Sequence, residues 1–352
     1  MVTDANIRKS GVTHHLEEIL AQAGIICTVY DKTTPNPTTD LVEAAREVYL
    51  LENCQAIIGF GGGSSIDCAK AVGARIARPR KSLAKMKGIL RVMRNLPLLI
   101  AIPTTAGTGS ETTLAAVITD SHTRHKYPIN DFPLIPAYAV LDPEVTRGLP
   151  PFVTATTGLD ALTHAVEAYI GNSTTEDTRH DALTAVKLIF GNLKRAYDNG
   201  NDMEARRNML QAAYFAGSAF TKSYVGYVHA IAHSLGGRYN TPHGLANAVL
   251  LPHVLRAYGK TAWKKLHILG MAAGVSTPHD THQAGAEKFI RAIEGLMEQM
   301  QIPRTIRGIR GRDIPMLAKY AAKEANPLYP VPKLMTAKQL EKFYWMIKEA
   351  HK

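Results

Sequence analysis

Cysteine is scarce in this chain, and long apolar runs are absent from it. Cys27, Cys54 and Cys68 are the only cysteines among 352 residues, and no two of them form a CxxC pair. An odd, widely spaced set of this kind excludes a disulfide framework and favours a reducing setting. No apolar run approaches the roughly 20 residues of a membrane span, and the segment MVTDANIRKSG lacks the features of a signal peptide. We therefore expect a cytoplasmic protein without a membrane partner.

Acidic residues are missing from residues 71–110, although 30 occur in the whole chain. The basic residues of this segment are Arg75, Arg78, Arg80, Lys81, Lys85, Lys87, Arg91 and Arg94. The net charge of +11 is therefore concentrated here, and the rest of the chain is close to balance. The segment also lacks the interleaved aromatic side chains on which nucleic-acid bases stack. We interpret it as a solvated basic surface and expect no nucleic-acid partner.

Strand-like and helix-like segments alternate in the first part of the chain. Short apolar runs predict strands at residues 26–30, 56–60, 96–103 and 137–142. Helical patterns lie between the first three, and such alternation is typical of a parallel sheet in an α/β domain. From Pro151 onward, amphipathic helical patterns dominate. Because a pair of prolines interrupts the chain here, we predict an α/β domain at residues 1–150 and an all-helical domain at 151–352.

A glycine-rich turn, GFGGGSSIDCAK, follows the second predicted strand. It places Gly61, Gly62 and Gly63 before a helix, in which Ser64 and Asp67 resemble a capping box. Backbone N–H groups at such a helix start can bind a pyrophosphate. The turn departs from a complete GxGxxG pattern, because Ser64 stands where the third glycine belongs.

A second loop, PTTAGTGSE, follows the third predicted strand and offers the hydroxyl groups of Thr104, Thr105 and Thr108. Loops at the carboxyl ends of neighbouring parallel strands form the crevice in which open α/β sheets bind nucleotides. The two loops together therefore predict a nucleotide-binding edge.

A carboxylate and several histidines are spaced as metal ligands in the helical part. Asp160 and His164 are four residues apart, as are His229 and His233, and residues at this spacing share one face of a helix. A proline interrupts the second helical pattern, so His243 returns from a separate segment. One carboxylate with two or three imidazoles predicts a site for Fe(II), Zn(II), Mn(II), Co(II) or Ni(II). Periodicity alone does not choose between His229 and His233.

Four motifs resemble those of the iron-containing (group III) alcohol dehydrogenase family, in which 1,2-propanediol oxidoreductases (lactaldehyde reductases) and butanol dehydrogenases are found. They are GGGSSIDCAK, PTTAGTGSE, GLDALTHAVEAY and HAIAHSLGGRYNTPHGLANAVLLPHV, and the resemblance runs in order through nearly all of the chain. It implies a dehydroquinate synthase-like fold, with an N-terminal α/β dinucleotide-binding domain, a C-terminal all-α domain and the metal in the cleft between them. The implied reaction is hydride transfer between a primary alcohol or diol and NAD(P).

The resemblance also implies roles for individual residues of the helical domain. By motif position the metal ligands are Asp160, His164, His229 and His243. The implied metal is Fe(2+), with Zn(2+) or another divalent ion as the alternative. His233 is left beside the nicotinamide as a proton relay. Phe220 matches a position that lines the substrate channel, although a place in the ordinary helix core explains it as well.

In the α/β domain the resemblance implies a set of cofactor-binding residues. The glycine turn holds the pyrophosphate, the threonines and a lysine contact phosphate and ribose, and an asparagine approaches the adenosine. The set is Asp4, Asn36, Gly61, Gly62, Gly63, Ser64, Thr104, Thr105, Thr108 and Lys126. Asp4 lies where the family meets the adenosine ribose, and a carboxylate there repels a 2′-phosphate. NAD is therefore preferred over NADP, although the basic segment favours NADP weakly.

Two departures from the family pattern concern the ends of the domains. The chain begins inside the family's first strand, so the opening strand is expected to be missing. Near the other end, ANPLYPVP keeps an Asn-Pro pair but lacks a cysteine that often precedes it. A homodimer or a higher homo-oligomer is expected, because the family forms dimers.

Three alternatives remain at this stage. The first is a glycerol dehydrogenase-like zinc enzyme of the same superfamily. The second is a metallohydrolase with Glu167 as the general base, although the HExxH pattern is absent. The third is a truncated, catalytically silent binding protein.

Overall fold

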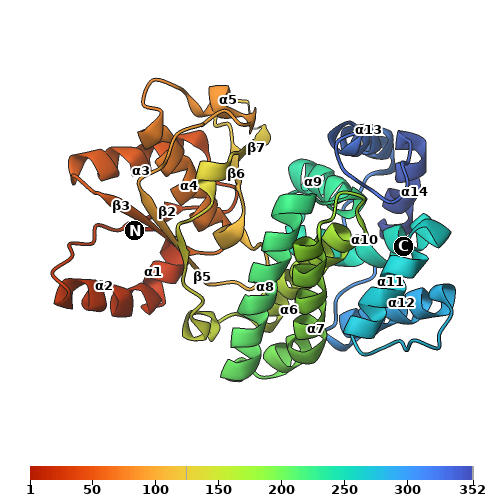
Figure 1. Cartoon of the computed structure of the whole chain (residues 1–352). Helices are drawn as coiled ribbons and strands as arrows, with labels where there is room; N and C mark the ends of the chain where they lie inside the picture. Colours follow the sequence, from red (N-terminus) through yellow and green to blue (C-terminus); the bar gives the residue numbers. More distant parts are fainter. Residues whose placement is uncertain (124, 351–352) are drawn as a thin grey trace. The chain divides into compact units, whose positions relative to one another are not determined.

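The computed structural model describes residues 1–123 and 125–350, which divide into two compact units, Met1–Thr146 and Arg147–Lys352 (Figure 1). The helices of the first unit are α1 (Ala5–Lys9), α2 (Val12–Gln22), α3 (Thr39–Leu51), α4 (Gly63–Ala77) and α5 (Leu83–Met86). Its strands are β1 (Val2–Asp4), β2 (Tyr30–Thr33), β3 (Ala56–Gly61), β4 (Gly88–Ile89), β5 (Leu98–Pro103), β6 (Ala115–Thr119), β7 (Lys126–Asn130) and β8 (Tyr138–Ala139).

Five of these strands form a parallel sheet with the order β2-β1-β3-β5-β8. The central pair, β3 and β5, is in register from Ala56↔Leu98 to Gly61↔Pro103, so both strands end at the same edge. In the view of Figure 1, α3 and α4 lie above the sheet, and α1 and α2 lie below it. A parallel sheet between layers of helices confirms the α/β fold predicted for this part of the chain.

The first predicted strand was misplaced. Residues 26–29 are not in a strand, and β2 begins at Tyr30, which pairs with Val2 of β1. The apolar composition of 26–30 favours a strand, but the pairing register with β1 decides where the strand lies. The last predicted strand is also shorter than 137–142, because only Tyr138 and Ala139 pair with β5.

A second sheet of three strands, β4-β7-β6, was not predicted from the sequence. Its strands β6 and β7 are antiparallel and pair from Ala115↔Asn130 to Thr119↔Lys126. The sequence KYPIN of β7 contains a proline, which is a poor predictor of a strand interior. Apolar side chains of this sheet, such as Ile118 and Ile129, are fully buried in the same core as those of α4.

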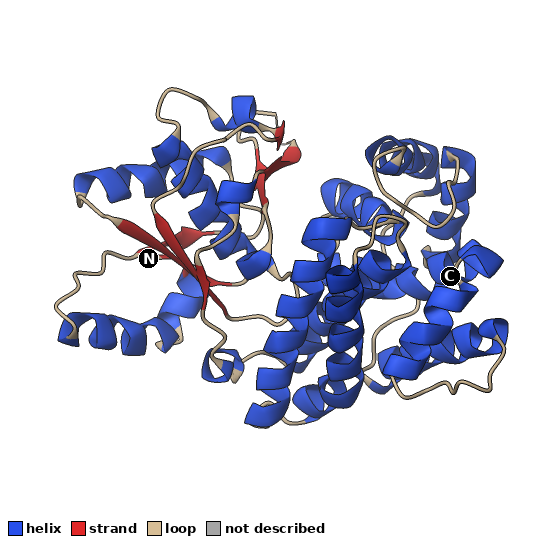
Figure 2. Cartoon of the chain, in the orientation of Figure 1, coloured by secondary structure: helices blue, strands red, loops and turns tan. Residues whose placement is uncertain are grey.

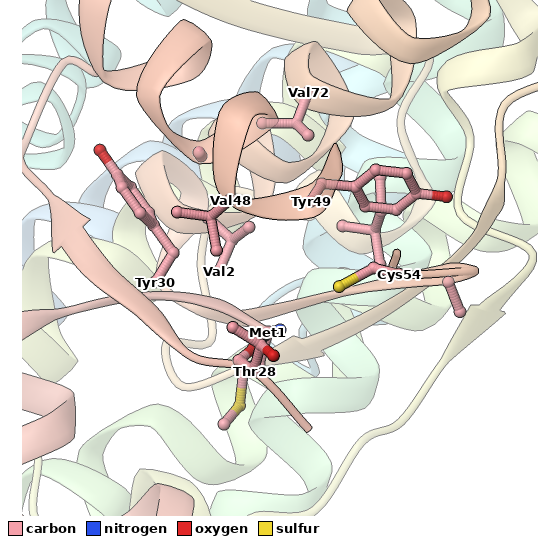
Figure 3. A pocket seen from close by; sticks show the side chains of 11 residues that line it. Met1, Val2, Thr28, Tyr30, Val48, Tyr49, Cys54 and Val72 are labelled. Atoms are coloured by element: carbon pink, nitrogen blue, oxygen red, sulfur yellow. Dashed lines mark hydrogen bonds between the residues drawn. The ribbon is translucent and has the colours of Figure 1, made fainter. Parts of the chain in front are cut away.

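A small pocket in the first unit lies toward the amino ends of the strands (Figure 3). It is lined by Met1, Val2, Thr28, Tyr30, Ala45, Val48, Tyr49, Cys54, Ala56, Ile57 and Val72. None of the predicted cofactor-binding residues is among them. The edge predicted to bind the nucleotide is at the opposite, carboxyl ends of the strands.

The described residues of the second unit form helices, and none of them is assigned to a named strand (Figure 2). The helices are α6 (Pro151–Ile170), α7 (Glu176–Asp198), α8 (Met203–Ser223), α9 (Tyr227–Tyr239), α10 (His243–Tyr258), α11 (Trp263–Ala272), α12 (His282–Gln299), α13 (Ile314–Ala325) and α14 (Ala337–Ile347). The central helix, α6, packs against α7, α8 and α10. Among the described residues, no helix has the length and apolar character needed to cross a bilayer.

Candidate metal centre and nucleotide-binding edge

Helix α6 supplies the first two predicted metal ligands. It begins at Pro151, in the first turn where proline costs no hydrogen bond, and continues through a sequence in which apolar residues alternate with threonines and a few ionisable side chains. The helix is buried along most of its length, so Asp160 and His164 are also buried, at 2% and 5% exposure. A carboxylate without a compensating charge is costly at such a position. The burial of Asp160 therefore itself indicates a cationic partner.

Helices α9 and α10 supply the two other predicted ligands. His229 lies in the first turn of α9 and is buried, whereas His243 is the first residue of α10 and is partly exposed. Pro242 is the residue before α10, and its fixed backbone separates the two helices, as the sequence indicates. Three helices thus bring four side chains of the same unit to one point.

The donor atoms of Asp160, His164, His229 and His243 all lie within 4.8 Å of one another. Oδ1 of Asp160 is 3.8 Å from Nε2 of His229 and 3.6 Å from Nε2 of His243. Ligand atoms about 3.4 Å apart surround a tetrahedral ion whose bonds are about 2.1 Å long. Among the described residues, the buried Nε2 of His229 has no hydrogen-bond partner. One carboxylate and three imidazoles therefore fit a divalent transition-metal ion in both chemistry and spacing.

Glu167, one turn after His164 on α6, holds His229 in place. Its carboxylate accepts hydrogen bonds from the backbone N–H groups of Gly226 and Val228, both at 2.8 Å, and lies 2.7 Å from Nδ1 of His229. With Nδ1–H directed at this carboxylate, Nε2 carries the lone pair that a metal ligand needs. Burial lowers the pKa of His229 well below its usual value, which keeps the imidazole neutral.

The environment of Glu167 is equally constrained. Burial raises the pKa of Glu167 to about 7, and the hydrogen bonds from Gly226 and Val228 partly oppose that rise. A side chain on Gly226 would collide with the carboxylate, since a Cβ there would lie 2.6 Å from Oε1. This role of Glu167 was not recognised in the sequence, where the residue was considered only as a hydrolytic base. The position of Glu167 three residues after His164 is visible in the sequence. Its contact with His229 is not, because that residue lies on α9, far along the chain.

Asn247 is a second residue that the sequence did not single out. It is fully buried on α10, one turn after His243, and its Nδ2 donates to Oδ1 of Asp160 at 2.6 Å. The same nitrogen lies 3.1 Å from Nε2 of His243. Asn247 thus fixes the orientation of the Asp160 carboxylate, the one anionic member of the cluster, as outer contacts of metal sites commonly do.

His233 and Phe220 flank the cluster without joining it. The His233 ring stacks on that of His243 at 5.2 Å between centroids, and its side chain is 41% exposed. Its Nδ1 lies 2.6 Å from Oε1 of Glu324. Phe220, near the end of α8, stacks on the His164 ring at 4.3 Å. His229 and His233 thus differ in burial, a difference that helical spacing alone does not reveal.

The glycine turn in the first unit leads into helix α4. Gly62 precedes the helix, and no side chain caps its first turn. Gly61 has φ +148°, a conformation that favours glycine, and a Cβ on Gly63 would lie 2.8 Å from the Thr108 side chain. The turn and the threonine loop therefore approach each other too closely to leave room for a side chain at Gly63.

The expected capping box of Ser64 and Asp67 is wrong. Because the helix already begins at Gly63, Ser64 lies inside it, and Asp67 is free to reach another segment. The Asp67 carboxylate accepts from the Ser110 hydroxyl at 2.7 Å and from the backbone N–H of Val117 at 3.1 Å. Asp67 thus ties α4 to the segment that follows the threonine loop.

The remaining predicted cofactor residues lie around the same edge of the sheet. The backbone N–H of Thr104, which is buried, donates to the Gly61 carbonyl, and Thr105 lies beside Gly62. Lys126 Nζ donates to Asn36 Oδ1 at 2.7 Å. The N–H of Asn36 in turn lies 3.4 Å from the Ser64 hydroxyl.

Asp4 ends β1 beside this turn. Its Oδ1 accepts from the backbone N–H groups of Asn6 and Ile7 and so caps α1. Its other oxygen, Oδ2, faces Gly61, where a Cβ would lie 3.8 Å away. The cofactor-binding roles of this set remain predictions, but its members are close together in the fold.

Comparisons with known proteins identify the family to which this chain is similar. The family profile described as iron-containing alcohol dehydrogenase matches residues 1–143, and the profile of the C-terminal part of the Fe-containing alcohol dehydrogenase family matches residues 154–347. Alcohol dehydrogenase 4 of Saccharomyces cerevisiae (strain YJM789) is 39% identical over 92% of this chain and 84% of its own length. The NAD-dependent methanol dehydrogenase of Bacillus methanolicus is 38% identical over 92% of this chain and 85% of its own. A crystal structure of 1,3-propanediol oxidoreductase superposes with a TM-score of 0.94 and 36% identity, covering 98% of this chain and 90% of that one.

Proposed function

This chain belongs to the iron-containing alcohol dehydrogenase family and is an NAD(P)-dependent alcohol dehydrogenase, and from that premise we propose its site and substrate class. The substrate is a short primary alcohol or diol, or the corresponding aldehyde. The site is built on Asp160, His164, His229 and His243, with Fe(2+) as the metal. The convergence of these four donor atoms within 4.8 Å, in a buried setting, is the observation that carries the proposal.

A divalent cation bound by these ligands supplies Lewis-acid stabilisation of the negative charge that develops on the substrate oxygen, while NAD accepts the hydride. The residues of the chain prepare this chemistry. Glu167 and Asn247 fix the two ligands His229 and Asp160, so no reorganisation is needed during the reaction. Phe220, stacked on His164, presents an apolar ring for the carbon part of the substrate.

His233 moves the proton in this proposal. Its partly exposed ring stacks on that of His243, so it connects the site with solvent. Oxidation of the alcohol releases a hydride from carbon to NAD⁺ and a proton from the hydroxyl group, and His233 carries that proton outward. In the reverse direction His233 supplies the proton to the oxygen of the aldehyde.

Replacing His233 by alanine is expected to lower kcat by about 10²-fold, the usual contribution of a positioned proton carrier. Metal content is expected to stay at the wild-type level, because His233 is outside the ligand cluster. The measurement pairs NADH absorbance at 340 nm with elemental analysis of the same sample. Loss of metal in this variant would instead make His233 a ligand.

The side chain of Asp4 determines the preference for NAD in our proposal. Replacing Asp4 by asparagine keeps an oxygen to cap α1 but removes the charge that repels a 2′-phosphate. The ratio of kcat/KM for NAD to that for NADP is expected to fall about tenfold or more, equivalent to one unfavourable charge contact of about 1.4 kcal/mol. Asp4→Gly is expected to act in the same direction. An unchanged ratio in both variants would remove Asp4 from cofactor recognition.

The alternatives are less well supported. A hydrolytic role for Glu167 conflicts with its geometry, since two backbone N–H groups and His229 already engage its carboxylate. The relatives named above are alcohol and diol dehydrogenases rather than glycerol dehydrogenases. The deciding assay follows NADH formation by anaerobically purified protein with short primary alcohols and diols. No turnover with any of them would refute the proposal.

The proposal extends to the cellular location and the oligomeric state of the protein. The scarcity of cysteine, with all three thiols free, supports a cytoplasmic protein. We expect a homodimer or a higher homo-oligomer, which light scattering of the purified protein tests directly.

A further inference from the structure

Two histidines on α9 have the same type of contact at one of their ring nitrogens. Nδ1 of His229 lies 2.7 Å from the carboxylate of Glu167, and Nδ1 of His233 lies 2.6 Å from that of Glu324. The two histidines are four residues apart and therefore share one face of the helix. Their surroundings differ, because His229 is 2% exposed and His233 is 41% exposed. One carboxylate–imidazole pair is thus inside the ligand cluster, and the other is at its open side.

Glu324 is held by contacts other than the one with His233. It lies in the last turn of α13, which packs against α9. The same oxygen that contacts His233, Oε1, accepts from the hydroxyl group of Tyr329 at 2.8 Å. Two donors on a single oxygen fix the direction of the carboxylate.

The segment after Glu324 is anchored independently. Oδ1 of Asn326 accepts from the hydroxyl group of Tyr227 at 2.6 Å, and its Nδ2 donates to the carbonyl of Met335 at 3.0 Å. Tyr227 is fully buried in the first turn of α9, so this network joins the end of α13 to the helix that carries His233. The distance between Glu324 and His233 is therefore determined by the fold rather than by a flexible surface contact.

We propose that Glu324 is a positioning residue for the proton transfer, which it controls by holding His233 in one tautomer and one ring orientation. This inference rests on the proposed function, in which His233 carries the proton. With Nδ1–H directed at the Glu324 carboxylate, the lone pair of His233 is on Nε2. That nitrogen accepts the hydroxyl proton as the alcohol loses its hydride to NAD⁺, and later releases it to solvent.

The first test replaces Glu324 by leucine, which has similar volume but accepts no hydrogen bond. We expect kcat to fall 10- to 100-fold, the usual cost of losing a partner that orients a functional histidine, with little change in KM. Metal content and NADH binding, measured by elemental analysis and by nucleotide fluorescence, are expected to stay at wild-type levels. Glu324→Gln keeps an acceptor for Nδ1–H and is expected to restore part of kcat. Tyr329→Phe removes only the second donor to Oε1 and is expected to lower kcat less than Glu324→Leu does.

The second test distinguishes positioning from a general structural role. If Glu324 acts through His233, then Glu324→Leu causes no further loss of kcat in a protein that already carries His233→Ala. An undiminished loss in that background, a loss of metal, or wild-type kcat for Glu324→Leu would each overturn the inference. Wild-type protein without any alcohol dehydrogenase activity would instead refute the proposed function. The two failures are therefore distinguishable.

Discussion

Replacing His243 by alanine is expected to abolish metal retention and to lower kcat/KM by about 10³-fold or more. His243 supplies one of four donor atoms, and its Nε2 lies 3.6 Å from the Asp160 carboxylate. Without it, a divalent ion would keep only the three candidate ligands on α6 and α9 and would be held less tightly. Loss of about 4 kcal/mol of Lewis-acid stabilisation corresponds to the expected rate decrease.

The measurement for this variant combines elemental analysis with the NADH assay on the same anaerobic preparation. His253→Ala is the matched control, because it removes a histidine from the same helix that is not part of the ligand cluster. The control is expected to retain metal and activity. Turnover by a His243→Ala protein from which metal has been stripped would remove His243 from the ligand set.

Replacing Glu167 by alanine is expected to weaken both the fold and the metal site. The change leaves the buried N–H groups of Gly226 and Val228 and the Nδ1 of His229 without their acceptor. Each buried donor left without an acceptor costs about 1–3 kcal/mol, and three donors are affected. The free energy of unfolding is therefore expected to fall by about 3 kcal/mol or more. Metal affinity is expected to fall 10- to 100-fold, because His229 loses the contact that fixes its tautomer.

Chemical denaturation and competition with a metal chelator measure the two effects of Glu167→Ala separately. Glu167→Gln is the companion variant, because it preserves the shape of the side chain and one acceptor oxygen. We expect it to lose less unfolding free energy and less metal affinity than Glu167→Ala. If Glu167→Ala lowers stability but binds metal with wild-type affinity, the carboxylate serves only the backbone at the start of α9.

The gathering of the four candidate ligands could be predicted from the sequence because helical spacing is a local property. Asp160 and His164 share a face of α6 whatever that helix packs against, and the proline before His243 marks a separate segment. The choice of His229 over His233 was implied only by family resemblance. The structure adds that His229 is buried and His233 is partly exposed, a difference that depends on how α9 packs and that periodicity does not reveal.

The contacts of Glu167, Asn247 and Glu324 could not be predicted for the same reason. Each contact joins residues on different helices. Glu167 and His229, for example, are 62 residues apart, and no local sequence pattern indicates that they meet. The sheet shows the same limit: β3 and β5 were close to their predicted ranges, whereas β2 was displaced because its position depends on pairing with β1. Asp67, too, was assigned a local capping role that a tertiary contact with Ser110 replaced.

Metal removal from the wild-type protein tests the central claim most directly. Protein purified without oxygen is analysed for metals and assayed with NAD and a short primary alcohol, before and after chelation and after addition of Fe(2+). Our account predicts close to one divalent ion per chain, loss of NADH formation on chelation, and recovery with Fe(2+). Full activity in protein freed of every divalent metal would contradict it.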